Sequence, residues 1–314
     1  MSKSVIVGLI QSSPVFMNLE ASLSKAVKQI GEAASRGAKL VVFGETWLAG
    51  YPAWLDYCPD AALWNHEPTK QVYARMRQNS LVVPGHETEL LAKAAGENKA
   101  AVIIGVNERV EKGAGNGTLY NSLLTFSEDG ELVNHHRKLI PTYTERLVWG
   151  QGDGDGLDGA DTAAGRVGGL ICWEHWMPLA RQVMHNAGEQ IHVSVFPTVH
   201  EMHQIASRHY AFEGRCFVLA VGLIMKIQDL PSELKTPDAL IQNLDGFLLR
   251  GGSAIIAPDG RYIAGPVFDE EVILTAEIDF SEIDKEKMSL DVSGHYSRPD
   301  VFDLNLKKGN RTKP

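Results

Sequence analysis

Short apolar, β-prone runs alternate with helix-like segments along the chain, and this alternation constrains the fold more than any other feature of the sequence. Residues 5–10 and 40–43 are continuous apolar runs, which are typical of strands buried on both faces of a sheet. Between these runs, apolar residues recur at helical spacing over residues 19–34. The pattern predicts an α/β fold in which helices pack outside mixed sheets.

The same alternation continues to the end of the chain. Helix-like segments are residues 87–98, 178–186 and 201–215, strand-like segments are residues 102–106, 170–172, 191–196 and 217–224, and hairpin turns fall at Asp129-Gly130 and Asp259-Gly260. Residues 150–159 are rich in Gly and Asp, but ten residues make a loop and not a linker between domains. We therefore expect one α/β domain.

Composition and charge exclude several classes of function. The 314 residues are 44% hydrophobic and carry a formal net charge of -9, without a long basic run, so binding to nucleic acid or to an anionic membrane has little support. The apolar run at residues 5–10 is too short for a signal peptide core or a membrane span. Three cysteines (Cys58, Cys172 and Cys216) do not form a disulfide framework, and we expect a cytoplasmic protein.

Cys172 stands where an apolar strand gives way to a polar and aromatic stretch. It follows Leu170 and Ile171 and precedes Trp173 and Glu174. Reacting groups collect at the carboxyl ends of strands in α/β sheets, so Cys172 is a candidate nucleophile. The alternative is a buried, inert thiol, because free cysteine is among the most buried residue types.

Three charged residues have positions that could serve the same site. Glu45 follows the apolar run at residues 40–43 and precedes an aromatic loop, where partial desolvation would raise its pKa toward values useful for proton transfer. Lys138 follows the predicted strand after the Asp129 turn, and its ammonium could stabilise developing negative charge or a thiolate. Glu145 is a further candidate carboxylate. Taken singly, each also fits an ordinary surface charge or ion pair.

Two clusters imitate metal sites but lack the required spacing. His200, His203 and His209 lie close together, yet the order His-Glu-Met-His differs from the His-Glu-x-x-His that places two imidazoles on one helix face. The acidic loop at residues 153–158 imitates a calcium loop, but Leu157 occupies a ligand position and no Glu closes the loop. We therefore expect no metal.

The stretches around Glu45, Lys138 and Cys172 resemble the signatures of the nitrilase superfamily of carbon–nitrogen hydrolases, and they occur in the order that the family uses. The resemblance extends over nearly the whole chain, from residues 6–11 to residues 294–300. Three separate motifs in the family's order are far more specific than any one of them.

Within this superfamily the sequence is most similar to the true nitrilase branch. Residues 172–179, with Cys-Trp-Glu-His followed by Pro-Leu, carry this similarity, as do residues 145–150 and 294–300. One departure is Gly44, which stands before the candidate base where proline is common in the family.

The resemblance implies a four-layer α-β-β-α sandwich that pairs through a helical layer into dimers, often extending to larger spirals. It also implies that no cofactor is used. On this basis we expect one carbon–nitrogen hydrolase domain over residues 1–314, with a C-terminal tail from about residue 286.

The resemblance further implies that Cys172 attacks a nitrile, with Glu45 as the base and Lys138 stabilising charge, while Glu45 or Glu145 activates water. A thioimidate and then a thioester would form on the cysteine, and a carboxylic acid and ammonia would be released. An amidase or N-carbamoyl hydrolase of the same superfamily remains an alternative, and so does a non-catalytic oligomer that binds a metabolite.

Three aromatic residues beside the candidate catalytic positions could form the walls of a substrate pocket. They are Tyr51, Trp173 and Phe196, each of which lies close to the end of a predicted strand. Core packing is the competing interpretation for each of them, because aromatic side chains also dominate hydrophobic cores.

Overall fold

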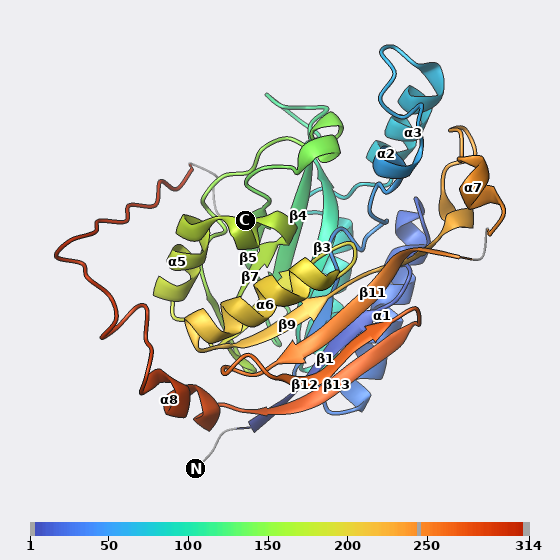
Figure 1. The fold of residues 1–314 in the computed structure, drawn as a ribbon. Coiled ribbons are helices and arrows are strands. Elements are labelled where there is room, and N and C mark those ends of the chain that lie inside the picture. Colours follow the sequence, from blue (N-terminus) through green and yellow to red (C-terminus); the bar gives the residue numbers. More distant parts are fainter. Residues whose placement is uncertain (1–3, 244–245, 310–314) are drawn as a thin grey trace.

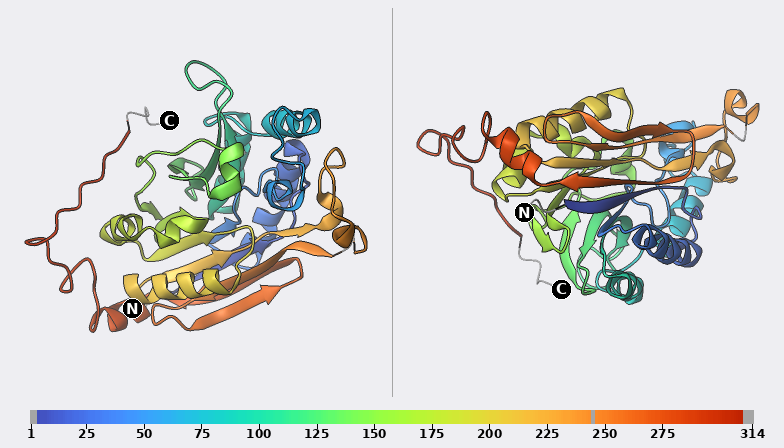
Figure 2. Two further views of the ribbon diagram at one scale, coloured as in Figure 1. Left: turned by 45° about the horizontal axis from the view of Figure 1, so that its top comes forward. Right: turned by 90° about the horizontal axis from the view of Figure 1, so that it is seen from below.

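Two β-sheets packed face to face, with helices on both outer faces, form the fold (Figure 1). The computed structural model describes residues 4–243 and 246–309. Seen from below, the layers follow one another as helix, sheet, sheet and helix (Figure 2). The predicted α-β-β-α sandwich is therefore confirmed.

The strands form one six-stranded and one seven-stranded sheet. In the first sheet the order is β13 (Val272–Asp279), β1 (Ser4–Gln11), β2 (Leu40–Phe43), β3 (Ala101–Arg109), β4 (Leu119–Phe126) and β5 (Leu132–Arg137). In the second the order is β10 (Ile224–Lys226), β11 (Phe247–Ile256), β9 (Phe217–Val221), β8 (Ile191–Val195), β7 (Gly165–Ile171) and β6 (Ala160–Thr162), with β12 (Tyr262–Phe268) paired to β11.

Helices lie outside the sheets and in the connections between strands. The α-helices are α1 (Leu19–Ser35), α2 (Trp54–Tyr57), α3 (Glu67–Gln78), α4 (His86–Asn98), α5 (Pro178–Asn186), α6 (Glu201–Gly214), α7 (Asp238–Ile241) and α8 (Ser281–Lys287). Short 3₁₀ turns are η1 (Tyr143–Leu147), η2 (Cys172–Trp176) and η3 (Ile227–Asp229). No helix in the described part of the chain combines the length and the apolar character needed to cross a bilayer.

Alternate side chains of the first sheet enter two different hydrophobic clusters. In β2, Leu40 and Val42 pack in the cluster that contains the second sheet, whereas Val41 and Phe43 pack with residues of α1 and α4. Because both faces of the strand are covered, all four side chains are buried. This double burial is the physical reason for the continuous apolar run in the sequence.

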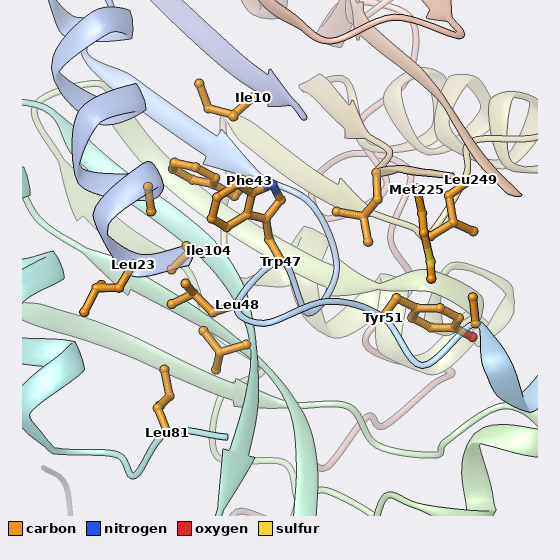
Figure 3. Packing of buried hydrophobic residues seen from close by; sticks show 14 of the residues in the cluster. Ile10, Leu23, Phe43, Trp47, Leu48, Tyr51, Leu81, Ile104, Met225 and Leu249 are labelled. Atoms are coloured by element: carbon orange, nitrogen blue, oxygen red, sulfur yellow. The ribbon is translucent and has the colours of Figure 1, made fainter. Parts of the chain in front are cut away.

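Trp47 fixes the segment that follows β2. Its ring lies edge-on to Phe43 with the ring centroids 5.0 Å apart, and its indole N–H donates to the carbonyl oxygen of Ser12 at 3.0 Å (Figure 3). The backbone between Phe43 and Trp47 is therefore held at both ends, which limits the positions open to the Glu45 side chain.

The strands that precede the candidate catalytic residues run in matching directions within each sheet. β2 is parallel to β3, and β5 runs in the same direction because both β3–β4 and β4–β5 are antiparallel. In the second sheet, β7, β8 and β9 are parallel to one another. The carboxyl ends of β2 and β5 therefore lie at one edge of the first sheet.

The fold differs from the sequence prediction in several places, which include one strand that is shorter than predicted and elements that were not predicted, such as α3 and β13. The strand predicted over residues 217–224 is interrupted after Val221, because the Leu223 N–H donates to the Pro197 carbonyl oxygen at 2.9 Å, and a separate strand, β10, begins at Ile224. Helix α3 was not predicted, since only Val72 and Met76 of its mostly polar sequence are buried. Strand β13 was also missed, since most of its side chains are only partly buried.

Gly105 in β3 lies against the backbone that carries the candidate base. A Cβ atom at this position would come within 2.4 Å of both the Gly44 carbonyl oxygen and the Thr46 nitrogen. Backbone atoms cannot swing aside as a long side chain can, so the segment around Glu45 would have to move. Only glycine therefore fits between β3 and this segment without displacing it.

We predict that Gly105→Ala lowers the free energy of unfolding by about 1–3 kcal/mol, as for other overpacked sites, and also impairs activity by displacing Glu45. Urea denaturation and a rate assay would measure the two effects. Gly31→Ala in α1 is the matched control, because the nearest atom to its Cβ is Asn98 Oδ1 at 3.6 Å, and alanine favours helix. Equal stabilities of the two variants would contradict this account.

Candidate active site

The structure brings all four predicted catalytic side chains into one buried cluster. Lys138 Nζ lies 3.0 Å from Glu45 Oε1 and 2.7 Å from Glu145 Oε2. Lys138 and Glu45 are almost completely shielded from solvent, and Cys172 and Glu145 are also buried. One cation is therefore enclosed by two carboxylates next to a thiol.

Further donors hold the Glu145 carboxylate in place beside Lys138. The Tyr51 hydroxyl donates to Glu145 Oε1 at 2.9 Å, and the backbone N–H of Thr142 donates to Glu145 Oε2 at 2.7 Å. Together with Lys138, these donors satisfy both oxygens of the Glu145 carboxylate. Such a fully bonded carboxylate keeps a fixed position.

Cys172 begins a 3₁₀ turn directly after β7. Its φ is +53°, in the left-handed region that non-glycine residues seldom adopt. The carbonyl oxygen of Cys172 accepts a hydrogen bond from His175 Nδ1 at 2.7 Å. The chain changes direction sharply at the end of the strand, and Cys172 lies at this bend, where it lines a cavity.

Glu174, which sequence reasoning did not select, joins the two strand ends that carry Lys138 and Cys172. Its carboxylate accepts from the backbone N–H of Leu139 and from that of Ile171, both at 2.7 Å, and from His136 Nε2 at 2.9 Å. Burial opposes ionisation of Glu174, but the charge and hydrogen bond of His136 and the two N–H groups lower its pKa. Glu174 is thus a buried carboxylate that ties together both sheets.

Asn121 at the start of β4 is a second residue that sequence reasoning missed. Its Nδ2 donates to Glu45 Oε1 at 2.7 Å. Its position in the buried strand sequence Leu-Tyr-Asn-Ser-Leu was a signal, since a buried amide needs a polar partner. The other oxygen, Glu45 Oε2, is buried and has no hydrogen-bond partner among the described residues, so it remains able to accept a proton.

The surroundings of Glu45 leave its ionisation finely balanced. Burial and the charge of Glu145 together raise the pKa of Glu45 to about 7, although the positive charge of Lys138 acts against this rise. Hydrogen bonds from Lys138 and Asn121 oppose the rise, because they stabilise the ionised form. A carboxyl group with a pKa near neutrality is suited to both taking and returning a proton.

The thiol and the ammonium of the cluster respond to burial in different ways. Burial raises the pKa of Cys172 well above its usual value, Glu45 raises it further, and Lys138 and the Trp173 N–H act in the opposite direction. For Lys138, burial alone would lower the pKa, but the charges of Glu45, Cys172 and Glu145 raise it above the usual value. The site therefore combines a neutral thiol, a permanent cation and a base.

A cavity of about 750 Å³ opens onto Cys172. Its walls include Tyr51 and Trp173, as well as Tyr143, Met177 and His203. Phe196, the third predicted wall residue, does not line this cavity. Its fully buried ring packs against the rings of His175 and His203, with centroids 5.1 and 4.6 Å away, so it lies behind the wall.

The two clusters that imitate metal sites have other roles. His200 and His203 line the cavity at the start of α6, whereas His209 lies on the exposed side of α6 near Glu213. In the acidic loop, the Asp155 N–H donates to Asp153 Oδ1. Across residues 4–243 and 246–309, no group of three or more His, Cys, Asp or Glu side chains is arranged to hold a metal ion.

Gly44, the departure from the family pattern, packs against Leu223. A Cβ at Gly44 would come within 2.7 Å of Leu223 Cδ2, so a larger residue there would require this side chain to turn away. Glycine at position 44 therefore leaves the room that the Leu223 side chain occupies beside Glu45.

Comparison with known proteins agrees with this geometry. The family model for carbon-nitrogen hydrolase matches residues 6–287. An aliphatic nitrilase of Sinorhizobium fredii (strain HH103) is 41% identical, with 94% of this chain and 93% of that protein covered. A bifunctional nitrilase/nitrile hydratase of Lupinus angustifolius is 36% identical, with 95% and 85% covered. The chain belongs to the carbon–nitrogen hydrolase family.

Solved structures extend the comparison to the fold. The chain resembles Nit3 of Saccharomyces cerevisiae, a member of branch 10 of the nitrilase superfamily, with a TM-score of 0.68 and 20% sequence identity. The match covers 94% of this chain and 97% of that one. The sandwich is therefore shared over nearly the full length of both proteins.

We predict that Asn121→Ala raises the pKa of Glu45 above its value of about 7, because the ionised carboxylate loses a hydrogen bond. A hydrogen bond to a charged group contributes about 1.5–3 kcal/mol, so the acid-side midpoint of the rate profile should move up by about 1–2 pH units. Tyr51→Phe, which removes a bond to Glu145 only, should leave this midpoint in place. An unmoved midpoint in Asn121→Ala would contradict the role of Glu45.

Proposed function

We propose that this chain is a nitrilase of the true nitrilase branch, which hydrolyses an organic nitrile to the carboxylic acid and ammonia. The observation that carries the proposal is the similarity to relatives named nitrilases, which extends over more than nine tenths of this chain. The buried cluster of Cys172, Lys138 and two carboxylates beside a cavity supplies chemistry that fits this reaction.

Glu45 is the general base of the proposed first step. The thiol of Cys172 is held neutral by its raised pKa, so it needs a base as its sulfur attacks the nitrile carbon. Glu45 takes the thiol proton and returns it to the nitrile nitrogen, which gives a thioimidate. Lys138 stabilises the negative charge that develops on this nitrogen, and the Trp173 N–H is a second donor.

Two molecules of water complete the reaction. The first adds to the thioimidate carbon and gives a tetrahedral intermediate that bears a hydroxyl group, an amino group and the sulfur. Ammonia leaves after its nitrogen is protonated, and a thioester remains. The second water, activated by Glu45 or Glu145, releases the acid and restores the Cys172 thiol. The thiol and Lys138 supply the nucleophile and the positive charge, so the scheme requires neither metal nor cofactor.

We infer that the chain self-associates through its outer helices into dimers or larger spirals. Support comes from large apolar side chains exposed around α5 and α6, namely Trp176, Leu179, Met202, Ile205 and Phe212. Several large apolar side chains exposed on neighbouring elements are typical of protein interfaces. Analytical ultracentrifugation tests the inference, and a stable monomer at working concentration would overturn it.

Two further proposals concern the chain as a whole. We propose that residues 1–314 form a single hydrolase domain with a C-terminal tail from about residue 286, supported by the family match over residues 6–287 and by the lack of helix or strand in residues 288–309. We also propose a cytoplasmic location, supported by three cysteines that are all free.

We predict that Cys172→Ala, Glu45→Gln and Lys138→Ala each lower kcat for a nitrile by about 10³-fold or more, because the three groups act as a unit. For the same reason, the double variant of Glu45 and Lys138 should be scarcely slower than either single variant. Ammonia release measured on a panel of nitriles and amides is the assay.

Control variants and a second class of substrate allow this assay to distinguish a nitrilase from an amidase and from a binding protein. Cys58→Ala and Cys216→Ala should keep their activity, because neither sulfur belongs to the cluster. Activity on amides alone would move the chain to the amidases. Turnover of neither class, with an ordinary Cys172 thiol, would indicate a binding protein. Substantial activity of Cys172→Ala would refute the mechanism.

We predict that Glu145→Gln raises the ratio of amide to acid or causes the thioester to accumulate. The tetrahedral intermediate can expel ammonia, which leads to the acid, or the Cys172 thiol, which leads to the amide. Removing one of the two carboxylates beside Lys138 should slow protonation of the leaving nitrogen or activation of the second water. Product chromatography and mass spectrometry of the stalled enzyme measure these outcomes. An unchanged rate and ratio, matching the surface control Glu111→Gln, would rule out this role.

A further inference from the structure

A chain of buried polar groups runs from the backbone of Cys172 into the layer between the second sheet and α6. His175 Nδ1 lies 2.7 Å from the Cys172 carbonyl oxygen, and His175 Nε2 lies 3.0 Å from His192 Nε2. His192 Nδ1 in turn lies 2.8 Å from Glu189 Oε2. All of these side chains are buried, and none takes part in the proposed chemistry.

The direction of each hydrogen bond follows from the one at Cys172. A carbonyl oxygen can only accept, so His175 carries its proton on Nδ1. Burial and the neighbouring His192 lower the pKa of His175 to about 3, so its ring is neutral and Nε2 has no proton. The Ser194 hydroxyl donates to this Nε2 at 2.8 Å. Two bare nitrogens 3.0 Å apart would repel each other, and His192 must therefore carry a proton on Nε2.

To complete this chain of hydrogen bonds, Glu189 and His192 must hold one more proton than an ionised Glu189 beside a neutral His192 would hold. With His192 protonated on Nε2, its Nδ1 can face Glu189 favourably in two ways. Either Glu189 is protonated and donates to Nδ1, or His192 is an imidazolium beside a carboxylate. In both cases the pair of Glu189 and His192 holds one additional proton inside the protein.

We propose that this shared proton, held by Glu189 and His192, locks His175 onto the Cys172 carbonyl and thereby positions the thiol for attack. Glu189, His192 and His175 are positioning residues, because they act through the backbone of Cys172 and do not line the cavity. The left-handed φ of Cys172 makes the anchor necessary, since the backbone has no intrinsic preference for this conformation. The inference rests on the proposed role of Cys172 as the nucleophile.

Other titratable groups surround Glu189 and bear on its proton. The Tyr210 hydroxyl on α6 donates to Glu189 Oε1, and His185 Nδ1 on α5 lies 3.8 Å from the same oxygen. His185 Nε2 faces Glu213, which is paired with Arg181, so the side of His185 away from Glu189 is already occupied. Further titratable neighbours of the chain are the Cys216 thiol, the His203 ring and the Glu174 carboxylate, which is bound to His136.

The position of the shared proton predicts how the anchor depends on pH. Burial raises the pKa of Glu189 to about 7, with His185 and Tyr210 acting against the rise, and burial lowers the pKa of His192 well below its usual value. At lower pH the proton therefore resides on Glu189 and the chain is complete. As the pH rises through this pKa, Glu189 loses its proton, and the carboxylate then favours the form of His192 that carries its proton on Nδ1. His192 Nε2 is left without a proton in that form, so its hydrogen bond to His175 is lost.

Glu189→Gln separates this proposal from a merely structural role. The glutamine amide would donate permanently to His192 Nδ1 and still accept from Tyr210, so it imitates protonated Glu189 at every pH. The readout is the rate of Cys172 alkylation by iodoacetamide, followed by peptide mass spectrometry from pH 5 to pH 9. The ratio of the Glu189→Gln rate to the wild-type rate should be close to one at acid pH and rise to about tenfold at alkaline pH.

A second variant and a control complete the experiment. His192→Phe keeps a ring of similar size but breaks the chain, and it should slow alkylation about tenfold to a hundredfold across the acid and neutral range. Glu213→Gln changes a carboxylate that contacts His185 and not His192, and its ratio to the wild type should not vary with pH.

The outcomes distinguish the anchor from the proposed function. A Glu189→Gln ratio that stays constant with pH would overturn the proposal, as would wild-type reactivity in a folded His192→Phe. If His192→Phe failed to fold, the pH dependence of the Glu189→Gln ratio would still decide. Failure to hydrolyse any nitrile, combined with the expected alkylation pattern, would refute the nitrilase assignment and leave the anchor intact.

Discussion

The contact on which the whole site depends is the enclosure of Lys138 between Glu45 and Glu145. Removing an ammonium and two carboxylates from water is costly unless the charges are paired and their remaining hydrogen-bonding capacity is used. Besides the ion pairs, the structure supplies three further donors, which are Asn121 for Glu45 and the Tyr51 hydroxyl and Thr142 N–H for Glu145. A rigid cluster with fixed charges results, and such preorganisation is what a charged transition state requires.

The sandwich makes this cluster possible because strands from both sheets end at it. Glu45 and Lys138 follow strands of the first sheet and Cys172 follows a strand of the second, so the relative position of the sheets sets the distance between base, cation and thiol. Glu174 is the direct link, because a single carboxylate accepts N–H groups from the segment after β5 and from the end of β7. The apolar cluster that contains Leu40 and Val42 together with strands of the second sheet packs the two sheets against each other.

Burial has opposite consequences in the two polar networks near the thiol. In front of Cys172, the charge of Lys138 offsets part of the desolvation of Glu45 and keeps its pKa within reach of neutral pH. Behind Cys172, the described residues place imidazole rings and no ammonium against Glu189, with His185 Nδ1 3.8 Å away, and our proposal is that Glu189 and His192 hold a shared proton there. In the proposed scheme, the first network transfers protons and the second holds the backbone of Cys172 in place.

The sequence by itself determined the α/β class, most of the strands and helices, and the three strand-end positions of Glu45, Lys138 and Cys172. These features depend on local periodicity and on motifs that are each contained within a few consecutive residues. Residues whose roles come from contacts across the fold were not accessible in this way. Asn121 reaches Glu45 across 76 positions of sequence, and Phe196 turns away from the cavity. The proton that we propose for His192 and Glu189 is inferred from the contacts that join Glu189, His192 and His175. Tertiary structure decided these points, because the direction of a buried side chain is set by the packing of both sheets and not by its neighbours in the chain.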